Sequence, residues 1–300
     1  MNLLYLPDME KEFKVAEHLF KVSMPESCPL WQMMDSYTPF LTEEAGDPVF
    51  VLEYADSLPE TGKTAVFTEI PEDEGQSRIE LYRTNDGGWW FEMAPTSRAE
   101  AIGCLMCNEN FTAGKFMTRV RNSRAAFVLN NGLMLMFAFR TATLGTLEMH
   151  SSVVMKDGRG YMFLGKSGTG KSTHSRQWLE HIPDTELLND DNPIIRVSDN
   201  GEVRVYGSPW SGKTPCYKAK DVPVGAIVRI RQCPENKITR YSILESYASV
   251  YSSCSGFKAD STMSDGLHAT LEKVVTTVPC FVLDCRPDHE AADVCYAAVR

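Results

Sequence analysis

The sequence predicts an α/β protein of two domains: a β-rich domain over residues 1–145 and a phosphate-binding α/β domain over residues 146–300. Three observations support this division. Residues up to Arg121 read as short strands separated by turn residues, and Asn122 to Ala142 has the apolar spacing of a core helix. The strand-like run Tyr161 to Leu164 then leads into a glycine-rich loop and a helical pattern. With 300 residues and 43% apolar content, the chain is long enough for two ordinary cores.

The clearest element of the first domain is a β-hairpin. Its strands are Ile79 to Thr84 and Trp89 to Met93, which flank Asn85-Asp86-Gly87-Gly88, a run that tolerates the positive φ of a tight turn. Val49 to Tyr54 and Thr64 to Ile70 are predicted as further strands.

The helix from Asn122 to Ala142 ends this domain. Its longest uninterrupted apolar run, Leu133 to Phe139, has seven residues and stops at Arg140, whereas a membrane helix needs about 20. We therefore expect a core helix and a soluble protein without a membrane partner.

In the second domain, strands and helices alternate. Strands are expected over Leu147 to Met155 and Tyr161 to Leu164, with a turn between them at Asp157 to Gly160. A helix is expected over Lys171 to His181, with His174 at its surface. The remaining elements are four brief strands and then a helix, a strand and a helix: Glu186 to Leu188, Pro193 to Val197, Val203 to Tyr206, Val224 to Ile230, Ser264 to Thr277, Cys280 to Leu283 and Glu290 to Val299.

Composition narrows the function classes. The net charge of −10 opposes nucleic acid and anionic membranes, whose binding needs clustered Lys and Arg, so no nucleic-acid partner is predicted. Nine cysteines scattered along the chain fit reduced thiols, and Cys104-x-x-Cys107 lacks the second ligand pair of a zinc site. The acidic start, Met1 to Phe13, has no basic-then-apolar pattern of a signal peptide, so a cytoplasmic location is expected.

The strongest motif matches G-x-x-x-x-G-K-[ST]. Its glycines let successive backbone N–H groups point at phosphate oxygens, and the helix that follows adds the positive end of its dipole. In this motif Lys171 reaches the β- and γ-phosphates, and the Ser172 hydroxyl is a ligand of Mg²⁺. The candidate ATP-binding residues are Gly165, Lys166, Ser167, Gly168, Thr169, Gly170, Lys171, Ser172 and Thr173.

Two further features decide between a nucleotide switch and an enzyme. Asp190-Asp191 follows the apolar Leu187-Leu188, and paired carboxylates at a strand end suit phosphoryl transfer. One carboxylate can hold Mg²⁺ while the other accepts the proton of an attacking hydroxyl. His150 lies at the end of a strand-like segment, 15 residues before Gly165.

With these residues in hand, the stretch from Leu147 to Val299 resembles the HPr kinase/phosphorylase catalytic domain and its relatives, which share a core with ATP-dependent phosphoenolpyruvate carboxykinase. The resemblance lies in "MHSSVVMKDGRGYMFLGKSGTGKST" and "LLNDDNPII". The segments "VYGSPWSGKTP", "VPVGAIVRIRQCPENKI" and "VPCFVLDCRPDHEAADV" resemble the less-characterised HPr-kinase-like subgroup.

This resemblance implies a kinase core that binds ATP and Mg²⁺. It implies that Ser172 and Asp191 bind the metal, and that Asp190 and His150 take up the proton of the acceptor hydroxyl. Lys171 is implied to be catalytic as well. Trp210 and Lys213 are implied as walls of the site. A homo-oligomer is a further expectation, since true HPr kinases are hexamers.

The predicted function is transfer of the γ-phosphate of ATP to a hydroxyl on an unidentified protein, peptide or small molecule. The glycine-bearing signature by which true HPr kinases bind their protein substrate is absent, so the acceptor stays open. One alternative is a nucleotide-binding accessory or scaffold protein without productive transfer, and another is a carboxykinase-like enzyme.

Overall fold

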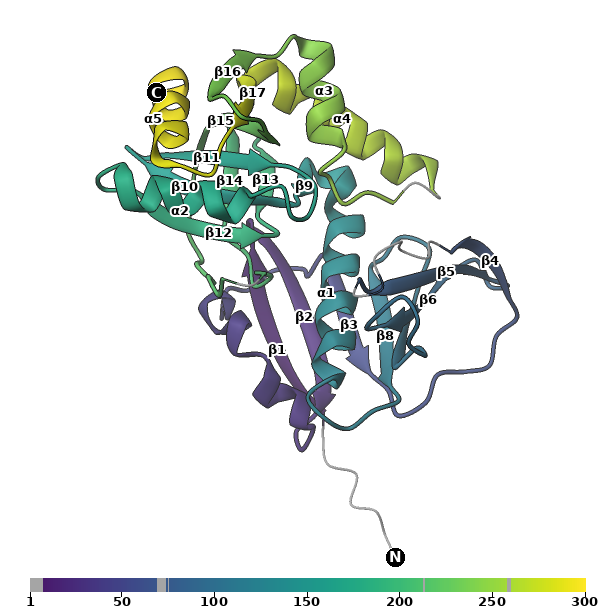
Figure 1. Ribbon diagram of the computed structural model, residues 1–300. Helices are drawn as coiled ribbons and strands as arrows, with labels where there is room; N and C mark the ends of the chain where they lie inside the picture. The colour runs from purple at the N-terminus through teal and green to yellow at the C-terminus, as the bar shows by residue number, and fades with distance from the viewer. Residues whose placement is uncertain (1–7, 69–73, 75, 213, 258–259) are drawn as a thin grey trace, which may run out of the picture. The chain divides into compact units, whose positions relative to one another are not determined.

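The structure is a computed structural model that describes residues 8–68, 74, 76–212, 214–257 and 260–300. The chain divides into two compact units, Met1–Arg140 and Thr141–Arg300, and each is built on its own mixed β-sheet (Figure 1). The predicted α/β class is therefore present in both units.

The described residues of the first unit form eight strands, two 3₁₀ helices and one α-helix. Their bounds are β1 (Asp8–Val15), β2 (His18–Pro25), η1 (Pro29–Met33), η2 (Asp35–Phe40), β3 (Phe50–Tyr54), β4 (Lys63–Thr68), β5 (Arg78–Thr84), β6 (Trp89–Ala94), β7 (Gly103–Cys107), β8 (Ala113–Thr118) and α1 (Ala125–Thr141). The strand order is β1-β2-β3-β8-β7-β6-β5-β4. Strand β3 runs parallel to β2 and β8, and the other neighbours are antiparallel.

The predicted hairpin is confirmed as β5 and β6, and Gly87 in its turn has a φ of 85°. The strand predicted from Val49 is β3. The strand predicted over Thr64 to Ile70 is β4, whose described part ends at Thr68, and Ile70 lies outside the described residues. The two 3₁₀ helices were not predicted, because they are short, contain proline and show no helical periodicity.

The apolar helix α1 packs on this sheet. Strand glycines let it approach closely: a Cβ on Gly103 would lie 2.6 Å from Val128 Cγ2. Phe137 meets Phe20 edge-on, with ring centroids 6.2 Å apart. Residues Ala125–Leu144 are long and apolar enough to cross a membrane by length and composition, yet 61% of the apolar window is buried within the structure. This segment is thus a buried core helix.

The second unit carries the glycine-rich loop within a nine-stranded sheet. Its elements are η3 (Ala142–Leu144), β9 (Thr146–Glu148), β10 (Ser151–Lys156), β11 (Arg159–Leu164), α2 (Lys171–His181), β12 (Glu186–Asp191), β13 (Ile194–Val197), β14 (Val203–Tyr206), β15 (Asp221–Gln232), β16 (Lys237–Arg240), α3 (Ile243–Tyr251), α4 (Ser261–Thr277), β17 (Cys280–Cys285) and α5 (His289–Val299). The strand order is β12-β10-β11-β15-β14-β13-β9, with β17 pairing with β15 and β16.

Helices cover both faces of this sheet (Figure 1). Alternate residues of β11 point to opposite faces. Tyr161 and Phe163 pack with Trp178 of α2 and with α5, whereas Met162 and Leu164 pack with α3 and α4. The parallel strands β11, β15 and β17 therefore lie in a three-layer core, and the glycine-rich loop leaves it at the carboxyl end of β11.

Two expectations for this unit were wrong. The segment Leu147 to Met155 is not one strand: β9 pairs with β13, β10 pairs with β11 and β12, and the chain changes partners at Met149 and His150. Helix α3 was missed, although Ser242 and Glu245 form a capping box at its start, a signal that is visible in the sequence.

Candidate functional site

The glycine-rich loop joins β11 to α2 in a conformation that requires glycine. Gly168 and Gly170 have φ values of 81° and 101°, and a Cβ on Gly165 would lie 2.2 Å from Thr169 Oγ1. No side chain caps α2, so the N–H groups of its first turn are available to a ligand. The loop has the shape and the donors of an anion site at a helix N-terminus.

Lys171, unlike the exposed Lys166 of the same loop, is buried. Its Nζ donates a hydrogen bond to Gly165 O at 3.0 Å and lies 3.0 Å from His150 Nε2. The side chain is 9% exposed, and burial lowers the pKa of Lys171, although Asp191 and Asp190 oppose this effect. No carboxylate among the described residues forms an ion pair with this buried ammonium, so it can bind an anion from solution.

Asp190 lies beside Ser172, which is in the first turn of α2. It is 5% exposed, and its Oδ1 accepts a hydrogen bond of 2.9 Å from Ser172 Oγ. Its backbone is fixed by pairing with Ser152 in β10 and by Gly212 N, which donates to Asp190 O at 2.7 Å. Ser172 and Asp190 thus present two hard oxygen donors at the mouth of the loop.

Asp191 lies beside His150 instead. Asp191 Oδ1 lies 3.3 Å from His150 Nε2, and both side chains are partly exposed. Asp191 has a φ of 153°, a backbone conformation that side-chain-bearing residues rarely adopt and that is typical of functional sites. The same Nε2 faces Lys171, so it can accept from the ammonium or donate to the carboxylate, and its protonation decides which contact forms.

Asn189 holds the aspartate pair in position. It is fully buried, and its Nδ2 donates to Ser208 Oγ at 3.2 Å and to Trp210 O at 3.1 Å, while Asn192 N donates to its Oδ1. Trp210 itself is buried, and Lys213, the other expected wall, lies outside the described residues. Asn189 was not predicted as a site residue, since its partners are about twenty positions away.

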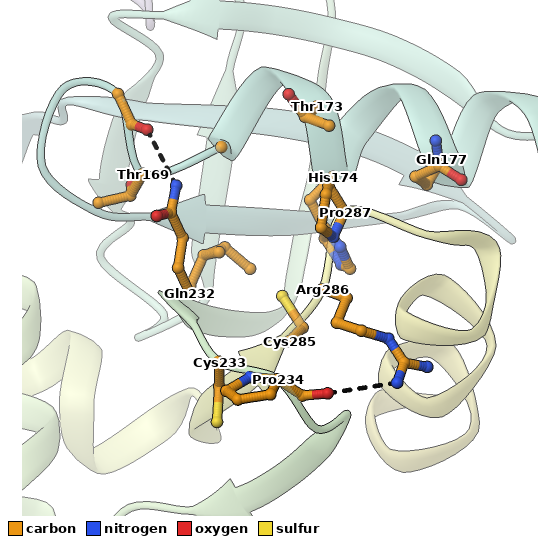
Figure 2. Close-up of a pocket in the computed structure, with 13 residues that line it drawn as sticks. Thr169, Thr173, His174, Gln177, Gln232, Cys233, Pro234, Cys285, Arg286 and Pro287 are labelled. Atoms are coloured by element: carbon orange, nitrogen blue, oxygen red, sulfur yellow. Dashed lines mark hydrogen bonds between the residues drawn. The ribbon is translucent and has the colours of Figure 1, made fainter.

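A cavity of about 570 Å³ opens on the outer side of the loop (Figure 2). Gly168 to Gly170 form one wall. Gln232 reaches from β15 and donates to Gly168 O at 3.3 Å, and Arg286, after β17, donates to Pro234 O at 3.2 Å. Its lining mixes apolar groups with a few polar side chains and is that of a small-molecule site.

His174 lines this cavity, and the prediction of its exposure was wrong. It was expected at the surface, but it is 4% exposed because it shares the inner stripe of α2 with Lys171, Ser175 and Trp178. Trp178 Nε1 donates to His174 Nε2 at 3.1 Å, and burial lowers the pKa of His174 to about 4. It is a neutral core histidine.

Glu148 is the other buried group that sequence reasoning missed. It ends β9, two residues before His150, and is 1% exposed, and neither carboxyl oxygen has a hydrogen-bond partner in the described part of the chain. Burial, reinforced by the charge of Asp191, raises the pKa of Glu148 to about 8. An acidic residue at the end of an otherwise apolar strand was the available signal.

The residues that could hold a divalent cation are few. In the part of the chain that the structure describes, no group of three or more His, Cys, Asp or Glu side chains could hold a metal ion. Mg²⁺ does not need such a cage, because it is commonly held by one or two protein oxygens together with substrate phosphates and water. Ser172 Oγ and Asp190 fit that donor set.

Comparison with known proteins adds little to this geometry. No protein-family model matches the chain, and no curated protein matches it. Among solved structures, the chain is similar to the HPr(Ser) kinase/phosphatase from Coxiella burnetii, with 11% sequence identity and a TM-score of 0.30. The match covers 51% of this chain and 93% of that one, and at this TM-score it carries no argument about function.

Proposed function

We propose that this chain is an ATP-dependent phosphotransferase that moves the γ-phosphate of ATP to a hydroxyl acceptor. The observation that carries the proposal is the convergence of Lys171, Ser172, Asp190, Asp191 and His150, linked by contacts of 2.9–3.3 Å at one end of β11. A phosphate-binding loop alone would be typical of a nucleotide-dependent switch protein. A phosphate-binding loop that faces a carboxylate and an imidazole is suited to phosphoryl transfer.

The nucleotide's triphosphate would lie on the backbone N–H groups of Gly168 to Ser172, with Lys171 neutralising the β- and γ-phosphates. The nucleoside would then extend into the adjoining cavity, where Gln232 and Arg286 offer hydrogen bonds and Pro234 and Pro287 offer apolar surface. The cavity size is within the ~300–1,000 Å³ range of small-molecule sites.

For the metal, we propose Ser172 and Asp190, the reverse of the assignment that the family resemblance implies. Asp190 contacts the Ser172 hydroxyl, whereas Asp191 contacts His150. Bound there, Mg²⁺ would neutralise charge on the phosphate oxygens. Each aspartate then has a single task, set by its partner.

Asp191 and His150 would serve the acceptor. As the hydroxyl oxygen bonds to the γ-phosphorus, the bond from that phosphorus to the bridging oxygen breaks, and ADP leaves with its electron pair. The hydroxyl proton passes to Asp191 and can be shared with His150 Nε2. Lys171 must leave His150 for this sharing, and the arrival of the γ-phosphate gives Lys171 a stronger partner.

The test combines Mg²⁺-ATP binding with transfer of labelled γ-phosphate to acceptors, including water and host lysate fractions. Lys171→Ala should lose binding and transfer. Asp191→Asn should keep binding and lose about 10²–10⁴-fold in transfer, the range of a general base. Asp190→Asn should raise the Mg²⁺ concentration required, and Lys237→Ala, an exposed lysine on β16, is the matched control.

Each outcome points to one function. Tight binding without transfer to any acceptor would favour the accessory protein, and a positive carboxylation assay would favour the carboxykinase-like enzyme. If wild type does not bind Mg²⁺-ATP, the proposal is wrong. If the effects of the two asparagine substitutions are exchanged, the kinase stands and the roles of the aspartates return to those first expected.

A further inference from the structure

Arg229 is a cation in the second unit that the proposed function has not used. It lies on β15, opposite Leu164, the last residue of β11 before the glycine-rich loop. It is half-buried, and within the described ranges no carboxylate lies within ion-pair distance of it. Burying a charge is costly unless it is paired, so an arginine held only by neutral groups needs an explanation.

The partners of Arg229 are serines at the end of α3. Its Nε donates to Ser249 Oγ at 2.7 Å, and its Nη2 contacts Ser249 O, Ser252 Oγ at 2.9 Å and Ser253 Oγ at 3.0 Å. Ser249 O is a carbonyl of the last helical turn, so these contacts stabilise the C-terminus of α3. They use two of the three guanidinium nitrogens.

The third nitrogen, Nη1, has no hydrogen-bond partner among the described residues, and it is not among the side-chain atoms shut off from solvent. Ser253 connects this group to the reaction site, because Ser253 O accepts a 2.7 Å hydrogen bond from His150 N while Ser253 Oγ accepts from Arg229. One serine therefore separates the arginine from the histidine. The positive charge of Arg229 is also close enough to oppose protonation of Lys171.

Arg231, two residues along the same strand, shows how an arginine is ordinarily paired here. Its Nε and Nη2 form a forked ion pair with Asp284, at 2.7 and 2.8 Å. The same residue type thus has a carboxylate partner away from the site and none beside it. Arg229 is therefore open to an anion that a ligand supplies.

We propose that Arg229 is a further catalytic residue whose free Nη1 contacts the phosphoryl group during its transfer, while Nε and Nη2 hold the guanidinium to the serines after α3. This inference rests on the proposed phosphotransfer. The transferring group carries negative charge on its equatorial oxygens, and Lys171 meets it from the loop. Arg229 would meet it from the His150 side, where the acceptor oxygen approaches.

Arg229→Lys separates this role from a structural one. Lysine keeps one positive charge for the end of α3, but its single nitrogen cannot serve the serines and the phosphoryl group together. Four quantities are measured in full-length protein: melting temperature, affinity for Mg²⁺-ADP, ATP turnover, and affinity for orthovanadate in the presence of Mg²⁺-ADP. Vanadate mimics the phosphoryl group in the transition state of its transfer, so the measurement does not require a known acceptor. Arg231→Lys is the matched control.

Arg229→Lys should keep its ADP affinity within about twofold and lose about tenfold or more in both turnover and vanadate affinity, as expected when one donor to developing charge is removed. Arg229→Gln should lose about 10²–10³-fold, and Arg231→Lys should match wild type in all four quantities. A folded Arg229→Lys protein with wild-type turnover and vanadate affinity would overturn the inference. This result leaves the phosphotransferase proposal intact. That proposal fails if the wild-type protein does not bind ATP, or binds it without transferring its γ-phosphate.

Discussion

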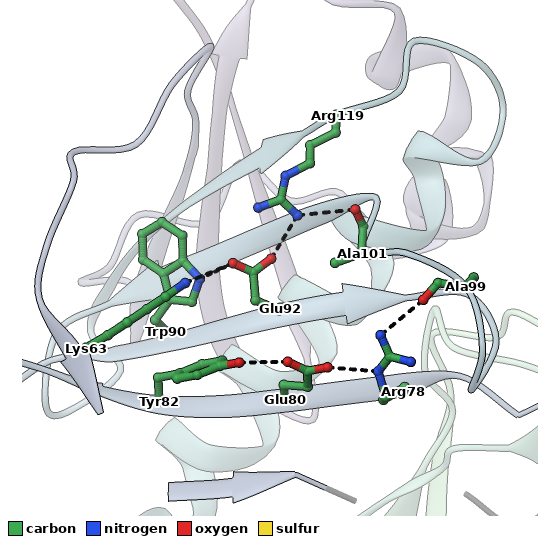
Figure 3. Close-up of polar contacts among 9 residues, drawn as sticks. All are labelled: Lys63, Arg78, Glu80, Tyr82, Trp90, Glu92, Ala99, Ala101 and Arg119. Atoms are coloured by element: carbon green, nitrogen blue, oxygen red, sulfur yellow. Dashed lines mark hydrogen bonds and ion pairs between the residues drawn. The ribbon is translucent and has the colours of Figure 1, made fainter. Parts of the chain in front are cut away.

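Two regions of the chain, the sheet around Glu92 and the surroundings of His150, treat charge in opposite ways. On the sheet of the first unit, charged groups satisfy one another: Glu92 accepts from Lys63, Arg119 and Trp90 at 2.8–3.0 Å (Figure 3). Beside it, Glu80 accepts from Arg78 and Tyr82. Near His150 in the second unit, Glu148 and the hydroxyl of Ser151 are buried with no partner among the described residues, and none of these residues pairs a carboxylate with Arg229.

This difference separates a stabilising network from a reactive one. Fully satisfied polar groups rigidify a fold, because each charge is neutralised where it lies. Groups left unpaired cost stability, and proteins tolerate that cost chiefly at functional sites. The paired groups around Glu92 are therefore typical of a stabilising network, whereas Glu148, Ser151 and Arg229 lie close to the proposed reaction site.

The largest effect on stability should come from the unpaired carboxyl of Glu148. The pKa of Glu148 is raised to about 8 in the folded chain, from 4.5. Between these values the unfolded chain releases a proton that the folded chain keeps, so stability is lost as pH rises from about 4.5 to about 8. Glu148→Gln removes this loss. As pH rises across that range, the free energy of unfolding of the variant, relative to that of wild type, should increase by a few kcal/mol (~1.4 per pKa unit).

Reversible denaturant unfolding near pH 5 and near pH 8 measures this effect. The amide of glutamine is also buried, so its own cost is the same at both pH values and cancels in the comparison. A difference between glutamine and glutamate that does not change with pH would mean that Glu148 has a partner, and the contrast between the two regions would weaken.

The sequence correctly placed the glycine-rich loop between a strand and a helix, which are β11 and α2. The loop from Gly165 to Ser172, the helix after it and the nearby Asp190-Asp191 all lie within one short stretch whose spacing dictates its geometry. The roles of the two aspartates depend instead on register, because Ser151 pairs with Asp191 and Ser152 with Asp190 across β10 and β12. A single sequence does not specify such a register.

The distant contributors could not be predicted for a related reason. Arg229 and Gln232 reach the site from β15, about sixty residues after the loop, only because β15 pairs in parallel with β11. The burial of His174 was not predicted, because the sequence of a short helix does not reveal which of its faces packs against the rest of the protein. In both cases the deciding information is the packing of one element on another.

In the first unit, we expect Glu92→Gln to destabilise the chain without affecting nucleotide binding. The carboxylate is 13% exposed; burial alone would raise the pKa of Glu92, but its donors outweigh burial and lower it. Removing the charge leaves Lys63 and Arg119 without their anion, at a cost of about 2 kcal/mol. Denaturant unfolding at neutral pH measures this, with Glu53→Gln, from the exposed pair with Lys115, as a control that should change by less than about 0.5 kcal/mol.

The smallest effect should be the contact of Lys63 with aromatic rings. Its ammonium lies 4.3 Å from the Trp90 ring centroid and 4.8 Å from that of Tyr82. A double-mutant cycle of Lys63→Met with Tyr82→Leu should give a coupling energy of about 0.5–1 kcal/mol. The same cycle with Tyr82→Phe, which keeps the ring face and removes only the hydroxyl bonded to Glu80, should give almost none. If both cycles give equal coupling, the hydroxyl network rather than the ring face connects Lys63 to Tyr82, and the paired sheet is stabilised by its hydrogen bonds alone.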